Sequence, residues 1–148
     1  MVDSISSSKN ERNSSRTGIR WVQESSSTMA RILYIEDDAN NRLLVRRILM
    51  ASGYDVEEAE NALEGISMAS TNPPDLILMD ISMPGMDGLT ATAELRNIPG
   101  LSNIPIVALT ANVMQGDRER TLNAGCDGYI RKPIDVDTFT DQITQYLT

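Results

Sequence analysis

The sequence predicts an α/β fold: a doubly wound, five-stranded parallel sheet in the order 2-1-3-4-5, with helices on both faces. Short apolar runs alternate with segments of helical periodicity, and Gly, Pro or Asn residues separate them. The chain has 148 residues, which is enough for one such domain and not for two. Right-handed crossovers leave few topologies, and this strand order is the usual one for a small domain.

Two regions of different composition divide the chain. Residues 1–28 are rich in Ser and poor in apolar side chains. Such a segment buries too little surface to offset the entropy that is lost on ordering. We therefore expect residues 1–28 to form a disordered N-terminal extension and residues 29–148 to form the folded domain.

The first two strands flank the first helix. Residues 32–35 form a short apolar run, which predicts a buried strand. Residues 40–52 have helical periodicity and end at Gly53, a residue that commonly closes helices. The predicted inward face of this helix consists of Leu44, Val45, Ile48 and Leu49. Residues 54–57 alternate in polarity and predict a more exposed strand.

The second helix leads into the central strand. Asn61 is a suitable N-cap for this helix, and Pro73 and Pro74 end it. The apolar side chains that share its inward face are Ala62, Ile66 and Ala69. Residues 76–79 are all apolar, as expected of a strand that is buried on both faces.

The remaining elements continue the alternation. A third helix is predicted to begin after Asp87, followed by a strand over residues 104–109 and a helix over residues 113–123. The inward residues of the third helix are predicted to be Leu89, Thr92, Ala93 and Leu95. A short strand over residues 129–130 precedes a last helix from about Asp135. Its predicted apolar stripe consists of Val136, Phe139, Ile143 and Leu147.

Composition excludes several classes of protein. The chain carries 13 basic and 21 acidic side chains, a formal net charge of −8, which argues against binding to nucleic acid. Cys126 is the single cysteine, so no disulfide forms within the chain and a reducing compartment is expected. No apolar stretch approaches the ~20 residues that span a bilayer, and no signal peptide is visible. We expect a cytoplasmic protein without a membrane partner. Histidine is absent, which excludes a catalytic or metal-binding His within the chain.

The strongest functional signal is a set of polar side chains that follow the predicted strands. Glu36 and Asp37 come directly after the first strand, and Asp80 comes after the third. Thr110 follows the fourth strand, and Lys132 lies just beyond the fifth. The carboxyl ends of parallel strands share one edge of the sheet, where such folds bind their ligands. These five side chains are therefore expected to meet in one cleft.

This combination of side chains predicts phosphoryl transfer. Asp37, Asp80 and an oxygen from the loop over residues 80–83 are hard ligands of the kind that Mg²⁺ prefers. Lys132 and the Thr110 hydroxyl add donors for phosphoryl oxygens. Asp80, at the tip of a strand, is the expected nucleophile and would form an aspartyl phosphate. Because no His acts as general base, hydrolysis is expected to be slow, which suits a signal.

Four separated segments resemble the receiver domain of two-component response regulators, and the resemblance covers about residues 30–147. These segments occur in the order and at the spacing of that family: residues 32–37, 75–88, 104–111 and 129–133. The resemblance implies a flavodoxin-like (βα)5 fold and a phosphoprotein of signal transduction. It also implies that the chain is not an enzyme in the usual sense, since it would catalyse only its own phosphorylation and slow dephosphorylation.

The resemblance also implies roles for the residues around the acidic end of the cleft. Asp80 corresponds to the phosphoacceptor. Glu36 and Asp37 correspond to the acidic pair that binds Mg²⁺ together with Asp80, Asp37 directly and Glu36 mainly through water. The backbone carbonyl of Ser82 corresponds to the remaining metal ligand of the protein. Magnesium is thus the one cofactor that the resemblance implies.

A second group of residues corresponds to the switch of the family. Thr110 and Lys132 would hold the phosphoryl oxygens, and Tyr129 would turn inward when Thr110 moves toward the phosphate. The family usually has a cis peptide bond where Lys132-Pro133 stands here. The surface of the fourth helix, fifth strand and fifth helix would then change and bind a downstream protein target.

The expected function is a stand-alone response regulator that receives its phosphoryl group from a phosphohistidine. Since the chain has no His, the donor is a separate histidine kinase or histidine phosphotransfer protein. Two alternatives stay open: a receiver fragment of a hybrid histidine kinase, and a phosphorelay intermediate. A phosphatase with an Asp nucleophile is disfavoured, because such enzymes typically have a second Asp, the acid/base, at the position that Ser82 occupies here. An interaction module that never takes phosphate is disfavoured by the intact set of polar residues.

Overall fold

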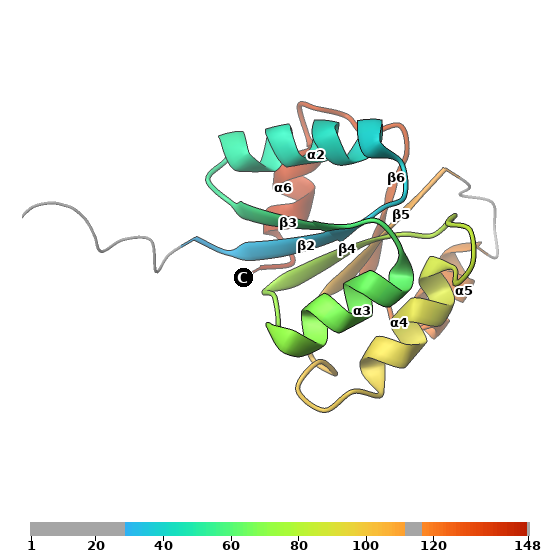
Figure 1. Ribbon diagram of the computed structural model, residues 1–148. Coiled ribbons are helices and arrows are strands. Elements are labelled where there is room, and N and C mark those ends of the chain that lie inside the picture. Colours follow the sequence, from blue (N-terminus) through green and yellow to red (C-terminus); the bar gives the residue numbers. More distant parts are fainter. Residues whose placement is uncertain (1–28, 112–116, 148) are drawn as a thin grey trace, which may run out of the picture.

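The computed structural model describes residues 29–111 and 117–147, which form one parallel sheet with helices on both faces (Figure 1). The strand order is β3-β2-β4-β5-β6, which is the order 2-1-3-4-5 along the chain. The predicted fold is therefore confirmed. The extension predicted over residues 1–28 lies outside the described residues, so its disorder stays a prediction.

Strands and helices alternate along the whole described chain. The strands are β2 (Arg31–Ile35), β3 (Asp55–Ala59), β4 (Leu76–Asp80), β5 (Ile106–Thr110) and β6 (Gly128–Arg131). The helices are α2 (Ala39–Ala51), α3 (Ala62–Thr71), α4 (Gly88–Arg96), α5 (Asp117–Asn123) and α6 (Phe139–Thr144). None of the helices that the structure describes is long and apolar enough to cross a membrane.

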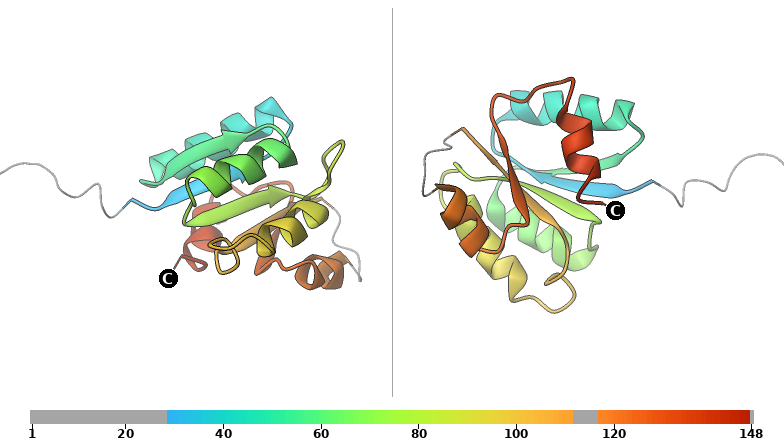
Figure 2. Two further views of the ribbon diagram at one scale, coloured as in Figure 1. Left: turned by 60° about the horizontal axis from the view of Figure 1, so that its bottom comes forward. Right: turned by 180° about the vertical axis from the view of Figure 1, so that it is seen from behind.

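The sheet separates two apolar layers. Helices α2 and α6 cover one face, and α3, α4 and α5 cover the other, as the two views of Figure 2 show. Successive residues of a strand point to opposite faces. Tyr34 therefore belongs to the layer under α2 and α6, whereas Leu33 and Ile35 belong to the layer under α3 and α4. All five residues of β4 are buried, because helices cover both of its faces.

Side-chain caps fix where three helices begin. Asn61 accepts a hydrogen bond from the Glu64 backbone N–H at 2.8 Å, and Asp87 accepts one from Thr90 at 2.8 Å. Both caps confirm the predicted helix starts. Asp38 caps α2 in the same way, with 2.8 Å to the backbone nitrogen of Asn40. Caps of this kind satisfy backbone donors that have no partner within the helix.

Two helical side chains that were expected to face the core are exposed. Leu44 is 41% exposed, because the buried stripe of α2 is centred on Val45 and Leu49. Consecutive helical residues are rotated by about 100°, which carries Leu44 out of that stripe. Ala93 is exposed for the same reason, since it follows the buried Thr92. When the apolar stripe of a helix is narrow, the sequence does not show clearly which residues at its borders face the core.

The last helix begins later than predicted. The backbone first turns at Asp135, whose carboxylate accepts a hydrogen bond from the Asp137 N–H at 2.9 Å, and regular helix starts only at Phe139. Val136 therefore lies in a turn and is 58% exposed, which corrects its place on the stripe. Phe139 and Ile143 are fully buried, as predicted.

The start of β5 also differs from the prediction. The strand predicted over residues 104–109 begins at Ile106, after Pro105, although the Pro105 carbonyl still accepts a hydrogen bond from Ile77 at 2.9 Å. A proline has no N–H for the ladder, which is why it lies just before the strand. Of the helix predicted over residues 113–123, the structure describes the part from Asp117 onward.

Candidate functional site

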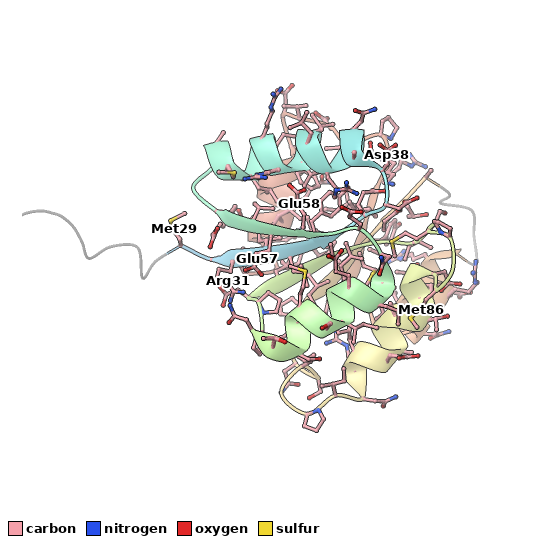
Figure 3. The ribbon with its side chains drawn as sticks, in the orientation of Figure 1. Met29, Arg31, Asp38, Glu57, Glu58 and Met86 are labelled. Atoms are coloured by element: carbon pink, nitrogen blue, oxygen red, sulfur yellow. The ribbon has the colours of Figure 1, made fainter. Side chains whose placement is uncertain are left out.

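The carboxyl ends of the strands gather the candidate residues at one edge of the sheet. In Figure 3, Asp38, just after β2, and Met86, in the loop after β4, lie at this edge, and Arg31, at the start of β2, lies at the other. The parallel register explains the gathering. Ile35 pairs with Met79, so the residues that follow them, Glu36 and Asp80, leave the sheet at the same level.

Three carboxylates meet at this edge. One oxygen from each of Glu36, Asp37 and Asp80 lies within 4.8 Å of the others. Glu36 is 1% exposed and Asp80 is 2% exposed, whereas Asp37 faces solvent. Carboxylates packed this closely repel one another unless cations compensate them. Three hard oxygen ligands around one point are the donor set that Mg²⁺ uses in proteins, so the residues present fit this ion.

Lys132 supplies positive charge to the same cluster. Its Nζ atom lies 3.0 Å from Asp80 Oδ1 and 3.2 Å from Glu36 Oε1. Burial alone lowers the pKa of the ammonium, but the hydrogen bond and charge of Asp80, joined by those of Glu36, outweigh it and raise the pKa above its ordinary value. Lys132 is thus a cation that bridges the two buried carboxylates. The Lys132-Pro133 peptide bond is cis, as predicted.

The structure adds contacts to Glu36 that sequence reasoning missed. Tyr34 donates its hydroxyl hydrogen bond to Glu36 Oε1 at 2.9 Å, and the Asp38 N–H donates to Oε2 at 3.3 Å. Arg42 Nη1 donates to the Glu36 carbonyl oxygen at 2.8 Å. The signal for Tyr34 was present: a Tyr within an apolar strand run lies two residues before Glu36 and so on the same side. No feature of the sequence predicts the hydrogen bond from Arg42, on α2, to the Glu36 carbonyl oxygen.

Ser82 and Thr110 lie beside the acidic cluster and line a neighbouring cavity of about 300 Å³. The Ser82 N–H points to Asp80 Oδ1 at 3.4 Å, and Thr110 is 8% exposed at the end of β5. The other lining residues are Ile81, Met83, Asp87, Leu89, Arg120 and Thr121. The edge of the sheet therefore offers room next to Asp80 together with hydroxyl groups.

Tyr129 lies on the same side of the sheet as Thr110. It pairs with Ala108 in the register of β5 and β6, and it packs, partly buried, against the apolar layer under α3 and α4. Ala108 belongs to that layer, and Thr110, two residues further along β5, points to the same face. Thr110 and Tyr129 therefore lie on the same face of two neighbouring strands.

Gly88 lets the start of α4 approach the strand end that carries Asp80. A Cβ atom at this position would meet the Asp80 carbonyl oxygen, and it would come within 2.9 Å of the Ile81 Cα. Gly88→Ala forces backbone against backbone, for an expected loss of about 1–2 kcal/mol. Urea unfolding measures this loss.

Gly85→Ala is the control that distinguishes the steric clash at Gly88 from backbone strain. Gly85 has a φ of 79°, and no atom lies within 4 Å of the added Cβ. This variant is expected to lose about 1 kcal/mol through strain alone and to keep the position of Asp80. A Gly88→Ala protein as stable as the wild type would show that α4 adjusts freely.

These features together define a class of protein: a doubly wound α/β domain with an acidic, lysine-bridged cluster whose oxygen ligands fit a divalent cation. The family model of the response regulator receiver domain matches residues 32–144. The chain therefore belongs to the response regulator receiver domain family of two-component signalling. Receiver domains are signalling domains and generally not enzymes in the usual sense.

Individual relatives agree with this assignment. The chain is 42% identical over 116 residues to the polar-differentiation response regulator DivK of Brucella anthropi. The aligned region covers 78% of this chain and 94% of that protein. Chemotaxis protein CheY4 of Vibrio cholerae has a similar structure, with a TM-score of 0.78, 27% identity and coverage of 81% of this chain and 100% of CheY4.

A third similar protein carries a metal. The receiver domain of a sensor histidine kinase from Pseudomonas aeruginosa PAO1 has a TM-score of 0.75 and 33% identity, with coverage of 81% of this chain and 98% of that domain. That structure is described with a magnesium ion coordinated in its active-site cleft. Magnesium is typical of the family, and the acidic cluster of the present chain has the matching chemistry.

Proposed function

We propose that this chain is a stand-alone response regulator in which Asp80 accepts a phosphoryl group from a phosphohistidine donor. The observation that carries the proposal is the contact between Lys132 Nζ and Asp80 Oδ1, at 3.0 Å, within the acidic cluster. The chain has no His, so the donor is a separate histidine kinase or phosphotransfer protein. The match over 94% of the length of a DivK relative supports the stand-alone reading.

The transfer uses the side chains in defined roles. A carboxylate oxygen of Asp80 attacks the phosphorus, a new O–P bond forms, and the P–N bond to the donor imidazole breaks. The imidazole nitrogen keeps the electron pair and takes up a proton. Lys132 and the Thr110 hydroxyl hold the phosphoryl oxygens, which leaves the Asp80 carboxylate aligned with the bond that breaks. The product is an aspartyl phosphate.

The acidic residues provide the place for Mg²⁺. Asp37 and Asp80 would bind it with the Ser82 carbonyl, and Glu36 would act mainly through water. When bound, the ion neutralises charge on the carboxylates and on the transferred phosphoryl oxygens. Glu36 and Asp80 are buried, so they present their oxygens in fixed positions, while the exposed Asp37 is open to the incoming ion.

Phosphorylation would then change a surface on the far strands. Thr110 moves toward the phosphoryl group, and Tyr129 follows into the space that Thr110 leaves. The two side chains lie on the same face of neighbouring strands, which supports this coupling. The surface of α5, β6 and α6 is the one that would bind a downstream protein target.

Removal of the metal tests the proposed chemistry. Incubation with a small acyl phosphate and Mg²⁺ is expected to add the mass of one phosphoryl group to the protein, and excess EDTA is expected to prevent this. Intact-mass spectrometry measures both. Equal labelling with and without the chelator would rule out a role for the acidic cluster in holding a metal.

A Tyr129→Ala variant tests the switch separately from the chemistry. Tyr129 is half-buried and has no place at the reacting atoms, so labelling is expected to stay within about twofold of the wild type. The near-UV circular dichroism change that accompanies labelling is expected to shrink, because Tyr129 is one of only 4 Tyr and is the one that moves with Thr110. A large loss of labelling would contradict the assigned role.

A further inference from the structure

Tyr34 carries a hydroxyl group whose place is not explained by packing. The side chain is 0% exposed and lies in the apolar layer with Val45, Leu49 and Phe139. A phenylalanine would fill the same space, and a buried hydroxyl is unfavourable unless it has a hydrogen-bond partner. That partner is Glu36 Oε1, at 2.9 Å. The hydroxyl therefore acts on the acidic cluster from the side of the core.

Glu36 and Asp80 compete for one cation. Lys132 Nζ lies 3.2 Å from Glu36 Oε1, the same oxygen that accepts the Tyr34 hydrogen bond, and 3.0 Å from Asp80 Oδ1. Glu36 is 1% exposed, so water compensates little of its charge. The Tyr34 hydroxyl stabilises Glu36 independently of Lys132. It leaves Lys132 free to stay with Asp80 and then with the phosphoryl group.

We propose that Tyr34 is a positioning residue of the magnesium and phosphoryl site: its hydroxyl fixes the Glu36 carboxylate and keeps Lys132 available to Asp80. The proposal rests on the proposed function and deepens it. Without the Tyr34 hydroxyl, Glu36 draws Lys132 closer to itself. The Glu36 carboxylate can then also rotate, because the hydrogen bond from Tyr34 no longer fixes its orientation. Groups that orient metal-binding carboxylates change metal affinity by about 10–100-fold when they are removed.

The Tyr34→Phe variant tests this inference, because it removes one oxygen and keeps the ring. Titration calorimetry with Mg²⁺ alone, without any phosphodonor, is expected to give a dissociation constant about tenfold weaker than the wild type. Labelling by a small acyl phosphate is expected to fall at limiting Mg²⁺ and to recover within about twofold at saturating Mg²⁺. The half-saturating Mg²⁺ concentration therefore shifts, and the maximal rate stays nearly constant.

Tyr54→Phe is the matched control. The Tyr54 hydroxyl lies 2.6 Å from Thr144 Oγ1, so this variant also loses a tyrosine hydrogen bond, at a contact that involves neither carboxylate. Its Mg²⁺ affinity is expected to equal that of the wild type. An unchanged Mg²⁺ affinity in Tyr34→Phe, even with lower resistance to urea, would show a purely structural hydroxyl and overturn the inference. An equal loss in both variants would overturn it as well.

A measurement on the unmodified protein covers the case in which Tyr34→Phe does not fold. Binding of Mg²⁺ is expected to produce a tyrosine feature in the near-UV difference spectrum, because the Tyr34 hydroxyl is bonded to Glu36. A Mg²⁺-saturated protein without this feature would refute the inference and leave the proposed function standing. A wild-type protein that neither binds Mg²⁺ nor takes the label would refute the proposed function itself.

Discussion

Asp80→Asn is expected to abolish phosphoryl labelling completely. The amide has nearly the shape of the carboxylate, but its oxygen carries no negative charge and is a poor nucleophile. The fold is expected to persist or to gain stability, because the change removes one of three carboxylates that lie within 4.8 Å of one another. Intact-mass spectrometry after incubation with an acyl phosphate and Mg²⁺ measures labelling, and urea unfolding measures stability.

Asp38→Asn is the control for this result. It makes the same chemical change beside the cluster, and Asn caps α2 as well as Asp does. Labelling of this variant is expected to stay at the wild-type level, because the Asp38 side chain bonds the backbone of α2 and not the cluster. Label that persists on Asp80→Asn would place the acceptor at another residue and defeat the proposed function.

The parts of the fold that follow from local patterns were predictable. Apolar runs identified the strands that are buried on both faces, because such strands admit few polar residues, and alternating polarity identified the more exposed β3. Parallel topology then placed the residues after each strand at one edge. The convergence of Glu36, Asp37, Asp80 and Lys132 therefore needed no coordinates. What the sequence could not supply was their separations, since those depend on side-chain rotamers.

Other features depend on tertiary contacts that leave no local trace. Val136 was misplaced because the turn that precedes α6 is stabilised by Asp135, so the helix starts about one turn later than predicted. The bond from Arg42 to the Glu36 carbonyl depends on how α2 lies over β2. From the sequence, Tyr34 was assigned only to the core, because its position within an apolar run indicates burial of the ring and gives no partner for the hydroxyl.

Lys132→Ala is expected to destabilise the metal-free protein strongly. Two carboxylates with 1% and 2% exposure lose their shared cation, and removal of one partner from a buried ion pair costs about 3 kcal/mol. Urea unfolding in EDTA measures the loss. Mg²⁺ is expected to recover much of it, because an ion bound only to the folded state stabilises that state by mass action. Labelling by an acyl phosphate is expected to persist, with loss of the accompanying near-UV change.

The pH dependence of this loss has a definite sign. The pKa of Lys132 is raised in the folded protein above its ordinary value of 10.5. Folding therefore favours the protonated ammonium, and its stabilising contribution is fully present below pH 10.5 and is lost as the pH rises through the raised value. The stability difference between wild type and Lys132→Ala is expected to be constant near neutral pH and to shrink in strong alkali.

Two further variants decide whether the loss arises from the buried carboxylates. Arg131→Ala removes the neighbouring, exposed positive charge and is expected to change stability by less than about 0.5 kcal/mol. Adding Asp80→Asn to Lys132→Ala is expected to restore part of the lost stability, because the amide needs no compensating cation. Such non-additivity is the signature of residues in direct contact. Strictly additive effects of the two changes would mean that Lys132 does not compensate Asp80, and the ion pair that supports the proposed chemistry would have no energetic basis.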